Sequence, residues 1–138
     1  MRPTKTEYYL GMAAEVATRS TCLRRQYGAV IVKNDVIIST GYNGAARGND
    51  NCCDLGYCYR EANNIPHGER YEKCQAVHAE MNAIISPDRE KMIGATLFRA
   101  GFDDGERIPD PKPCEMCRRV ISNAGIRRVI TNESEVYE

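Results

Sequence analysis

Two short motifs carry side chains that can bind a metal ion and move protons. His78 and Glu80 stand two residues apart, and Pro113 is followed by Cys114 and Cys117 in a Cys-x-x-Cys spacing. One imidazole and two thiolates leave the fourth position of a tetrahedral zinc open for water, as in catalytic zinc sites. Side chains at i and i+2 leave a helix turn in different directions. His78 can therefore bind the ion while Glu80 stays unbound and takes a proton from the attacking water.

Each motif fits more than one kind of site when it is taken alone. A lone Cys-x-x-Cys is also typical of a redox pair or of half a zinc ribbon, and a lone His-x-Glu is a weak signal. A further alternative is a non-catalytic domain in which zinc only holds the fold together. A structural zinc site has no use for an unbound acid, so Glu80 favours an enzyme. Together the two motifs indicate zinc-dependent hydrolysis.

Both motifs are expected at the starts of helices. The stretch Gln75–Ile85 has apolar residues at helical spacing, namely Val77, Met81, Ile84 and Ile85. A second helix is expected over Cys114–Asn123, with Gly125 as its cap. Helix N-termini carry partial positive charge, which stabilises thiolates. The pattern therefore predicts two helices with their N-termini directed at one metal site.

Apolar runs separated by turn residues predict the sheet that holds these helices. Four strands are expected, at Gly28–Lys33, Val36–Thr40, Gly94–Ala100 and Ile126–Thr131. The first two flank the turn Asn34-Asp35 and form an opening β-hairpin, and another helix is expected over Lys5–Arg19. Near-continuous apolar strands are usually covered on both faces. The expected fold is α/β, a single domain over residues 1–138 with a mixed sheet in a three-layer α/β/α arrangement.

A long polar segment, residues 45–74, separates the hairpin from the His-x-Glu motif. It holds the potential metal ligands Cys52, Cys53, Cys58, His67 and Cys74, and Cys22 precedes the hairpin. Long loops with few apolar residues usually have a function, and a structural zinc would hold this loop in one conformation. The alternative is that these cysteines are free thiols. A second polar segment, Gly101–Lys112, is expected to be a loop.

Composition limits the class of partner. The 138 residues include 19 basic and 19 acidic side chains, so there is no basic field to attract a polynucleotide. The sequence shows neither a signal segment nor an apolar run of membrane-spanning length. Seven cysteines fit metal binding in a cytoplasmic protein better than a disulfide framework. These features favour a small-molecule substrate, with neither polynucleotide nor membrane as a partner.

Two asparagines near the motifs are candidates for substrate contact. Asn43 lies in the run Gly41-Tyr42-Asn43-Gly44 at the end of an expected strand, and Asn82 follows Glu80 by two residues. The first belongs either to a plain Asn-Gly turn or to a ligand contact. The second is either a polar residue on the helix surface or a contact to substrate or water.

Six pieces of the sequence together match one known family. They are Cys22-x-Arg24-Arg25-x-x-Gly28-Ala29-Val30-Ile31-Val32, Ser39-Thr40-Gly41-Tyr42-Asn43-Gly44, Cys52-Cys53-Asp54, Val77-His78-Ala79-Glu80-Met81-Asn82-Ala83-Ile84, Pro113-Cys114-x-x-Cys117 and Asn123-Ala124-Gly125-Ile126. On these pieces the chain resembles the cytidine and deoxycytidylate deaminase superfamily, and more closely its deoxycytidylate (dCMP) deaminases.

The resemblance implies a cytidine-deaminase-like fold and a specific reaction. Zinc-dependent hydrolysis would convert dCMP to dUMP and ammonia, which supplies dUMP for dTMP synthesis. Glu80 would pass its proton to ring nitrogen N3 and later to the departing amine. Asn43 would lie near the sugar hydroxyl and the Ala79 backbone would read the base. Arg24 and Arg25 are candidates for binding the phosphate.

The resemblance also implies a second metal and an assembly. Cys22 and Cys52 match ligand positions of a structural zinc found in some members, and Cys74, Cys58 or His67 would complete it. A homo-oligomer, often a hexamer regulated by dCTP and dTTP, is a family expectation. Phe98 and Arg99 depart from the family, where an aromatic with a hydroxyl and an apolar residue are common. Alternative substrates are another small nucleotide, nucleoside or base, such as a modified pyrimidine nucleotide, dCTP or guanine.

Overall fold

The computed structural model describes residues 1–51, 53, 56, 62–64 and 76–137. In chain order the elements are α1 (Lys5–Ala17), β1 (Arg25–Lys33), β2 (Val36–Tyr42), β3 (Gly44–Ala45), β4 (Ala76–Val77), α4 (Ala79–Ile85), α5 (Arg89–Met92), β5 (Thr96–Asp103), β6 (Glu106–Arg107), α6 (Glu115–Asn123) and β7 (Arg128–Ile130). The main sheet runs β2-β1-β5-β6, and β7 also pairs with β5. β1 is antiparallel to β2 and β5, whereas β7 is parallel to β5, so the sheet is mixed.

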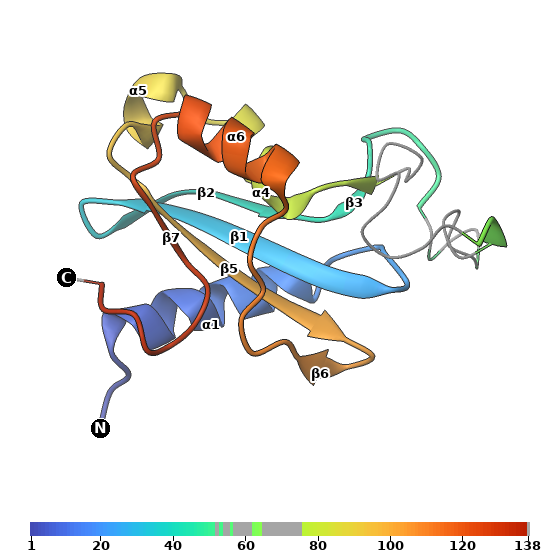
Figure 1. The fold of residues 1–138 in the computed structure, drawn as a ribbon, viewed down its shortest axis with the longest axis horizontal. Coiled ribbons are helices and arrows are strands. Elements are labelled where there is room, and N and C mark those ends of the chain that lie inside the picture. Colours follow the sequence, from blue (N-terminus) through green and yellow to red (C-terminus); the bar gives the residue numbers. More distant parts are fainter. Residues whose placement is uncertain (52, 54–55, 57–61, 65–75, 138) are drawn as a thin grey trace.

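The sheet lies between two helical layers. α1 covers one face, and α4, α5 and α6 lie on the other (Figure 1). β1 and β2 form a hairpin through Asn34-Asp35, whose φ angles of 52° and 61° are those of a tight hairpin turn. The α/β class, the three layers and the opening hairpin predicted from the sequence are confirmed.

Strand β1 contributes to two hydrophobic cores at once. Val30 and Val32 pack with Phe98 in the core beneath α1. Ala29 and Ile31 belong to the other core, which lies under α4 and α6. Successive side chains of a strand point to opposite faces. A continuous apolar run therefore supplies both layers, as expected for a strand buried on both sides.

Two glycines let the helices approach the sheet closely. A Cβ at Gly28 would lie 2.0 Å from the carbonyl oxygen of Ala13 in α1. A Cβ at Gly41 would lie 2.4 Å from the amide nitrogen of Ala83 in α4. Both contacts are to helix backbone, so no side-chain rotation could relieve them. The two glycines thus set the spacing between the sheet and each helical layer.

The helix predicted over Gln75–Ile85 begins later in the structure. Gln75 lies outside the described residues, and Ala76–Val77 forms β4, which pairs with β3. α4 starts only at Ala79, after His78 in an extended conformation. Pairing with β3 satisfies backbone groups that would otherwise favour a longer helix. Such a partner, distant in sequence, leaves no trace in local periodicity.

The buried side of α4 also differs from the predicted apolar stripe. The helix buries Ala79, Glu80 and Ala83, whereas Ile85, predicted to point inward, is 69% exposed. Small residues face the sheet because Gly41 brings the backbone of β2 against the helix. The prediction is therefore wrong for Ile85, whereas Met81 and Ile84 pack partly buried against the core, and Glu80 is a charged residue buried on that helix.

The segment Gly101–Lys112, predicted to be a loop, contains a short hairpin. β5 continues to Asp103, and the turn Asp104-Gly105 leads into β6. The φ angles of 53° and 80° are positive at both turn positions, as such a turn requires. This polar hairpin lacks the apolar alternation by which strands are identified in a sequence. It extends the sheet so that Asp103 stands opposite Arg25.

The N-terminal segment and the C-terminal tail up to Tyr137 both lie on the α1 side of the sheet (Figure 1). The Tyr137 amide donates a hydrogen bond of 3.0 Å to Thr6 Oγ1. The Tyr137 ring packs edge-on against the rings of Tyr9 and Phe98. The C-terminal tail therefore completes the core beneath α1, away from the helix starts that carry the two sequence motifs.

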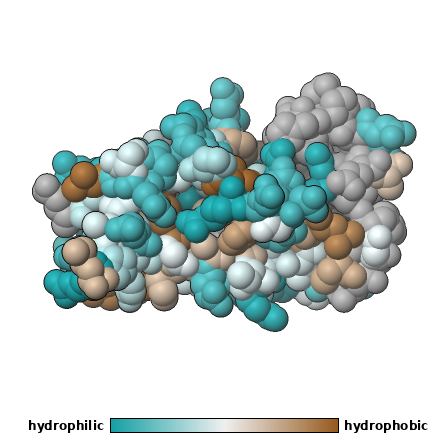
Figure 2. Space-filling model, turned by 90° about the horizontal axis from the view of Figure 1, so that it is seen from below, coloured by the Kyte–Doolittle hydropathy of each residue, from teal (hydrophilic) through white to brown (hydrophobic). Residues whose placement is uncertain are grey.

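Hydrophilic side chains cover much of the described surface in Figure 2, which views the molecule from below the orientation of Figure 1. Among the described residues, no helix has both the length and the apolar character needed to cross a bilayer. The cytoplasmic location expected from the sequence remains a prediction.

Candidate active site

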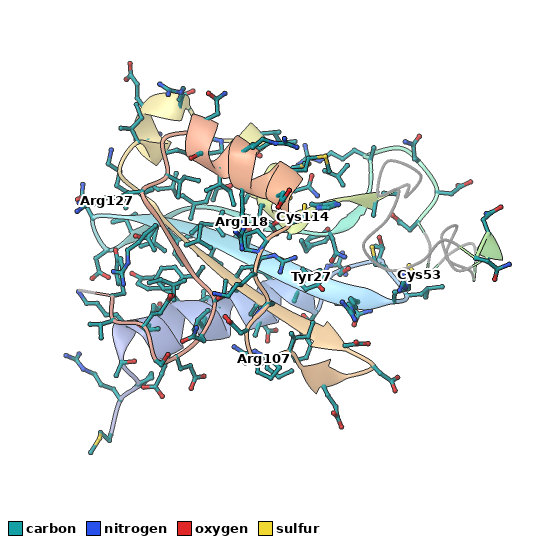
Figure 3. The ribbon with its side chains drawn as sticks, viewed as in Figure 1. Tyr27, Cys53, Arg107, Cys114, Arg118 and Arg127 are labelled. Atoms are coloured by element: carbon teal, nitrogen blue, oxygen red, sulfur yellow. The ribbon has the colours of Figure 1, made fainter. Side chains whose placement is uncertain are left out.

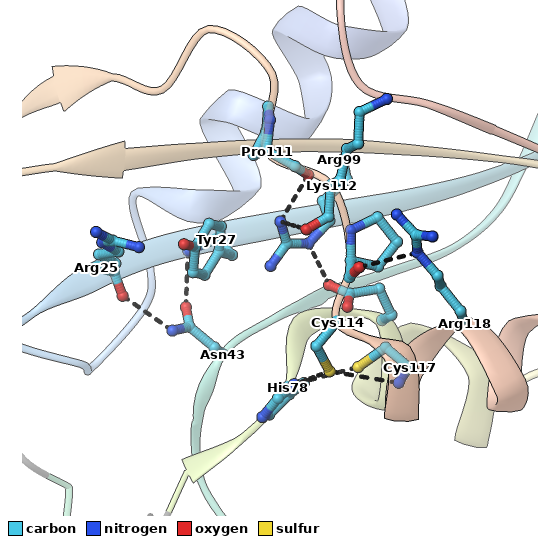
Figure 4. Close-up of polar contacts among 12 residues, drawn as sticks. Arg25, Tyr27, Asn43, His78, Arg99, Pro111, Lys112, Cys114, Cys117 and Arg118 are labelled. Atoms are coloured by element: carbon cyan, nitrogen blue, oxygen red, sulfur yellow. Dashed lines mark hydrogen bonds and ion pairs between the residues drawn. The ribbon is translucent and has the colours of Figure 1, made fainter. Parts of the chain in front are cut away.

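His78, Cys114 and Cys117 meet where α4 and α6 begin. His78 is the N-cap residue of α4, Cys114 is the N-cap residue of α6, and Cys117 follows within the first turn. His78 Nδ1 lies 3.1 Å from Cys117 Sγ and 3.7 Å from Cys114 Sγ. The three potential ligand atoms all lie within 4.8 Å of one another. Figure 3 places Cys114 at the sheet end of α6, and Figure 4 shows the three side chains converging.

The donor atoms and their spacing fit a zinc ion. With bonds of about 2.3 Å to sulfur and about 2.0 Å to nitrogen, a tetrahedral ion holds such ligands roughly 3.5 Å apart. The two nitrogen–sulfur distances of 3.1 and 3.7 Å lie on either side of that value. One imidazole and two thiols also leave a fourth position for water. The residues present can therefore hold a zinc ion of the catalytic type.

Cys117 is the deepest of the three residues. It is fully buried, whereas His78 and Cys114 are half-buried. Burial raises the pKa of the Cys117 thiol, and the nearby charge of Glu80 raises that pKa further. A bound cation has the opposite effect and stabilises the thiolate. Cys114 has a second task, because its sulfur accepts a hydrogen bond from the Cys117 amide and so caps α6.

Glu80 is buried beside this group with one carboxylate oxygen engaged. Its side chain is 0% exposed, and its Oε1 accepts a hydrogen bond of 2.6 Å from Arg99 Nε. Its Oε2 is buried without a hydrogen-bond partner among the described residues. An unpartnered buried carboxylate oxygen costs free energy. A water or substrate group that donates a hydrogen to Oε2 would remove that cost.

Arg99 is a site residue whose role the sequence alone did not reveal. It lies in β5, only 6% exposed, and its Nη1 donates to the carbonyl oxygens of Pro111 at 2.6 Å and Lys112 at 3.3 Å. Its guanidinium carbon lies 3.9 Å from the centre of the Tyr27 ring (Figure 4). One signal was present in the sequence. A charged residue in a strand covered on both faces needs a buried counter-ion, and Glu80 is an acid within a largely apolar stretch.

Asn43 is held firmly by the chain around it. Its Oδ1 accepts hydrogen bonds from Ser20 Oγ at 2.6 Å and from the Tyr27 amide at 2.8 Å. Its Nδ2 donates to the Arg25 carbonyl oxygen at 2.9 Å. A primary amide has a second N–H to donate. These three hydrogen bonds therefore fix the orientation of Asn43 and, within the described part of the chain, leave one N–H for a ligand.

The other predicted substrate contacts of α4 lie next to the metal-ligand group. Asn82 Nδ2 donates to the Tyr42 carbonyl oxygen at 2.8 Å, a contact that joins α4 to the end of β2. Ala79 is the first residue of α4 and is 1% exposed. The structure thus gives Asn82 a role in joining the two elements, and its contact with substrate stays a prediction.

The two arginines predicted to bind phosphate stand at the start of β1. Arg25 Nε lies 3.1 Å from Asp103 Oδ2 across the sheet, and both side chains are partly exposed. Arg24 is half-buried beside it. Because Arg25 already faces an acid, a phosphate there would compete with Asp103 for the guanidinium. Phosphate binding by either arginine stays a prediction.

Most predicted ligands of a second zinc lie outside the described residues. These are Cys52, Cys58, His67 and Cys74. Cys22 is described and lies half-buried between α1 and β1. The Cys53 amide donates to the Thr21 carbonyl oxygen at 3.0 Å, so part of the cysteine-rich segment lies beside Cys22.

Residues 3–133 match the family described as the cytidine and deoxycytidylate deaminase zinc-binding region. A protein named deoxycytidylate deaminase from Mycobacterium phage D29 is 40% identical over 134 residues, which cover 94% of each chain. A protein of the same name from Schizosaccharomyces pombe is 33% identical over 133 residues, and the match covers 96% of this chain. The match spans only 38% of that longer yeast protein.

A solved structure shares the fold. It is the dCMP deaminase of cyanophage S-TIM5 in complex with dCMP and dUMP, 28% identical to this chain with a TM-score of 0.62. The similarity covers 94% of this chain and 81% of that one. The family match over residues 3–133 includes both helix starts, β1, β2 and β5, which together make up the site described above.

Proposed function

The chain belongs to the cytidine and deoxycytidylate deaminase family, and we propose that it hydrolyses dCMP to dUMP and ammonia with the help of one zinc ion. The observation that carries this proposal is the buried Glu80 carboxylate beside three potential zinc ligands. A purely structural zinc site would not require that acid. The substrate follows from the phage relative, which is named deoxycytidylate deaminase and is similar over nearly the whole chain.

In this proposal His78, Cys114 and Cys117 hold the zinc ion. When bound, zinc acts as a Lewis acid that makes a water molecule more acidic at neutral pH. The helix starts at His78 and Cys114 add partial positive charge on the same side of the site. Burial of Cys117 keeps bulk water away from that side, which strengthens the electrostatic interactions inside.

Glu80 carries the protons between water and substrate. Its carboxylate accepts a proton from the attacking water as the new C–O bond forms at C4 of the base, and it delivers this proton to N3. It then passes the second proton of the water to the exocyclic amine, and the C4–N bond breaks to release ammonia. Oε2 is suited to these transfers because it is buried and has no other partner among the described residues.

The remaining contacts position the nucleotide. We assign to Asn43 a hydrogen bond to the sugar, which its remaining N–H supports. The backbone of Ala79 reads the base from the first turn of α4, and Asn82 supports that turn through Tyr42. Arg24 and Arg25 are the proposed phosphate contacts, for which the support is their charge and their place at the start of β1.

Glu80→Gln tests the mechanism. The amide is nearly isosteric but cannot accept the proton, so ammonia release from dCMP should fall about 100- to 10,000-fold. Zinc content and the far-UV circular dichroism spectrum should match those of the parent. Glu90→Gln, an exposed change in α5, is the matched control and should leave the rate unchanged. Undiminished ammonia release by the Glu80 variant would refute the assigned role.

A substrate panel tests the specificity. Ammonia release should be measured from cytosine, cytidine, deoxycytidine, CMP, dCMP, dCTP and guanine under one set of conditions. The proposal expects dCMP to have the highest kcat/KM. Activity on an unphosphorylated compound together with none on dCMP would contradict it.

We also propose a second, structural zinc bound by Cys22, Cys52 and Cys74 and completed by Cys58 or His67. Support comes from the hydrogen bond between Cys53 and Thr21, which holds part of the cysteine-rich segment next to Cys22. Metal analysis should give two zinc ions per chain. Cys22→Ser should reduce this to one, whereas Cys53→Ser should not. A parent protein with a single zinc would rule the second site out.

The assembly and its regulation are proposed from the family resemblance alone. We expect a homo-oligomer, with a hexamer as the leading size, and a response to dCTP and dTTP. Light scattering of the zinc-loaded protein, with and without each nucleotide, measures the assembly, and dCMP kinetics with each nucleotide measure the response. A monomer whose dCMP kinetics are unaffected by either nucleotide would contradict this part of the proposal.

A further inference from the structure

Arg99 lies in a buried part of β5, where removing a charged side chain from water costs free energy. Strand β5 is buried from Thr96 to Gly101, and the Arg99 side chain is 7% exposed. Its ion-pair partner Glu80 is 0% exposed, and the two are 2.6 Å apart. Removing two charges from water is expensive, and a buried pair is often no more stable than an apolar pair of the same size. Stability alone therefore gives a weak reason for an arginine here.

The geometry of the contacts gives a stronger reason. Arg99 uses Nε to hold Oε1 of Glu80 and Nη1 to hold the carbonyl oxygens of Pro111 and Lys112. A guanidinium is planar with five N–H donors in a fixed arrangement, so these contacts fix the carboxylate relative to the backbone. The ring of Tyr27, 3.9 Å from the guanidinium carbon, limits tilting of that plane.

Two parts of the site are joined through this one side chain. Pro111 and Lys112 immediately precede Pro113 and Cys114, the start of α6. Glu80 lies in the first turn of α4, which follows His78. Arg99 therefore connects the acid on one helix to the segment that leads into the other. Because it occupies Oε1, it also determines which oxygen of Glu80 is left without a partner among the described residues.

We propose that Arg99 is a positioning residue for deamination: it holds Oε1 of Glu80 so that Oε2 is the oxygen that exchanges protons with water and substrate. This inference rests on the proposed function. It concerns the orientation of the carboxylate, because the hydrogen bonds of Arg99 go to Glu80 and to two backbone carbonyls and not to the side chains of the zinc ligands.

Arg99→Gln, Arg99→Lys and the control Arg89→Gln form the first test. Arg89 is also an arginine bound to a backbone carbonyl, that of Asn123, but its side chain is exposed on α5. Misplacement of a catalytic group by about 1 Å can cost about 100-fold in rate. We expect kcat for dCMP to fall about 10- to 100-fold in Arg99→Gln with KM changed less than about threefold. Arg89→Gln should match the parent.

Arg99→Lys separates positioning from charge. Lysine keeps the positive charge beside Glu80 but cannot reproduce the fork that also holds the two carbonyl oxygens. We expect its kcat to lie between those of the parent and Arg99→Gln. If Arg99→Lys has the kcat of the parent, a positive charge beside Glu80 is sufficient for activity. That result would overturn the positioning role. If Arg99→Gln does not fold, a fall in kcat without a change in KM in Arg99→Lys carries the test.

Two readouts do not depend on activity. The cobalt-substituted Arg99 variants should keep the parent's metal content and thiolate-to-cobalt absorption, because the ligands His78, Cys114 and Cys117 are unaffected. A crystal structure of zinc-loaded Arg99→Lys should show the Glu80 carboxylate rotated from its parental orientation. Loss of the metal, or a Glu80 carboxylate that stays in place, would overturn the proposal. A parent protein that folds and binds zinc but deaminates nothing in the panel would instead refute the proposed function.

Discussion

At the scale of single residues, the two cysteines of the Cys-x-x-Cys motif have different structural roles. Cys114 is half-buried, and its sulfur accepts a hydrogen bond that caps α6, a task that a serine hydroxyl also performs well. Cys117 is fully buried in the core under α4 and α6, where replacing sulfur by a hydroxyl places a more strongly polar group away from water. Both should matter for zinc, but only Cys117 should matter for the metal-free fold.

Cys114→Ser and Cys117→Ser test this difference. In the metal-free protein, Cys114→Ser should leave the free energy of unfolding within about 0.5 kcal/mol of the parent. Cys117→Ser should lower it by about 1–3 kcal/mol, because it buries a polar group. Both should bind zinc much more weakly, since a serine hydroxyl is a poor substitute for a thiolate. Urea unfolding and competition with a zinc chelator measure the two quantities. Equal stability of the two metal-free variants would contradict the assignment.

The sequence identifies the residues of the site better than it identifies the contacts around them. His78, Glu80 and the Cys-x-x-Cys motif are identifiable because their spacing is local and chemically specific. The partner of Glu80 is not identifiable in this way. An ion pair between a helix and a strand is a contact distant in sequence, and local patterns do not report it. The anchoring of Asn82 to Tyr42 escaped prediction for the same reason.

At the scale of elements, α4 owes its position to a glycine in the strand beneath it. A Cβ at Gly41 would lie 2.4 Å from the Ala83 nitrogen and 2.5 Å from the Ala79 oxygen. Any side chain there must push α4 away from the sheet. Because α4 begins at the metal-ligand histidine and carries Glu80, such a shift would disturb the site as well as the packing.

Gly41→Ala should therefore lower both stability and zinc affinity. Overpacking against backbone should lower the free energy of unfolding by about 1–3 kcal/mol. Gly11→Ala is the matched control, since nothing lies within 4 Å of a Cβ at that position in α1. It should raise the free energy of unfolding by roughly 0.5–1 kcal/mol, because alanine favours a helix more than glycine does. Thermal unfolding and zinc titration of both variants measure these effects. A Gly41→Ala protein with parental zinc affinity would show that α4 can shift without cost to the site.

Most helices and strands were predictable from the sequence, but the residues at which they begin and end were not. The hairpin β1–β2 and α6 follow from apolar runs, a turn dipeptide and a capping glycine, all of which are local. The strand β4 at Ala76–Val77 and the hairpin within Gly101–Lys112 depend on pairing with other strands. Long, strongly patterned segments thus reveal themselves in the sequence, whereas two-residue strands form only where a partner is already in place.

At the scale of the whole molecule, the sheet separates the candidate site from a second core. Tyr9, Phe98 and Tyr137 pack together on the α1 side, and α4 and α6 cover the other side. Changes on the α1 side should therefore affect stability with little effect on zinc binding. One polar contact on that side makes the stability of the fold depend on pH.

The Tyr9 hydroxyl donates a hydrogen bond of 2.6 Å to Asp35 Oδ1 in the turn of the β1–β2 hairpin. This hydrogen bond, followed by the contact with Lys5, lowers the pKa of the Asp35 carboxyl from its ordinary value of 3.8. A carboxyl whose pKa is lower in the folded state stabilises the fold fully above the unfolded value. That contribution disappears as the pH falls through the folded pKa, because the protonated acid no longer gains from the contact.

Tyr9→Phe should therefore be less stable than the parent at pH 7, and the difference should shrink as the pH falls below 3.8. Unfolding by urea in the metal-free protein, followed from pH 7 to acid, measures this difference without interference from zinc release. Asp35→Asn should show the same flattened pH dependence, because the titrating group is gone. Combining the two changes should add little, since both remove one contact. A stability gap between Tyr9→Phe and the parent that stays constant into acid would mean that the tyrosine stabilises the fold through packing and not through Asp35.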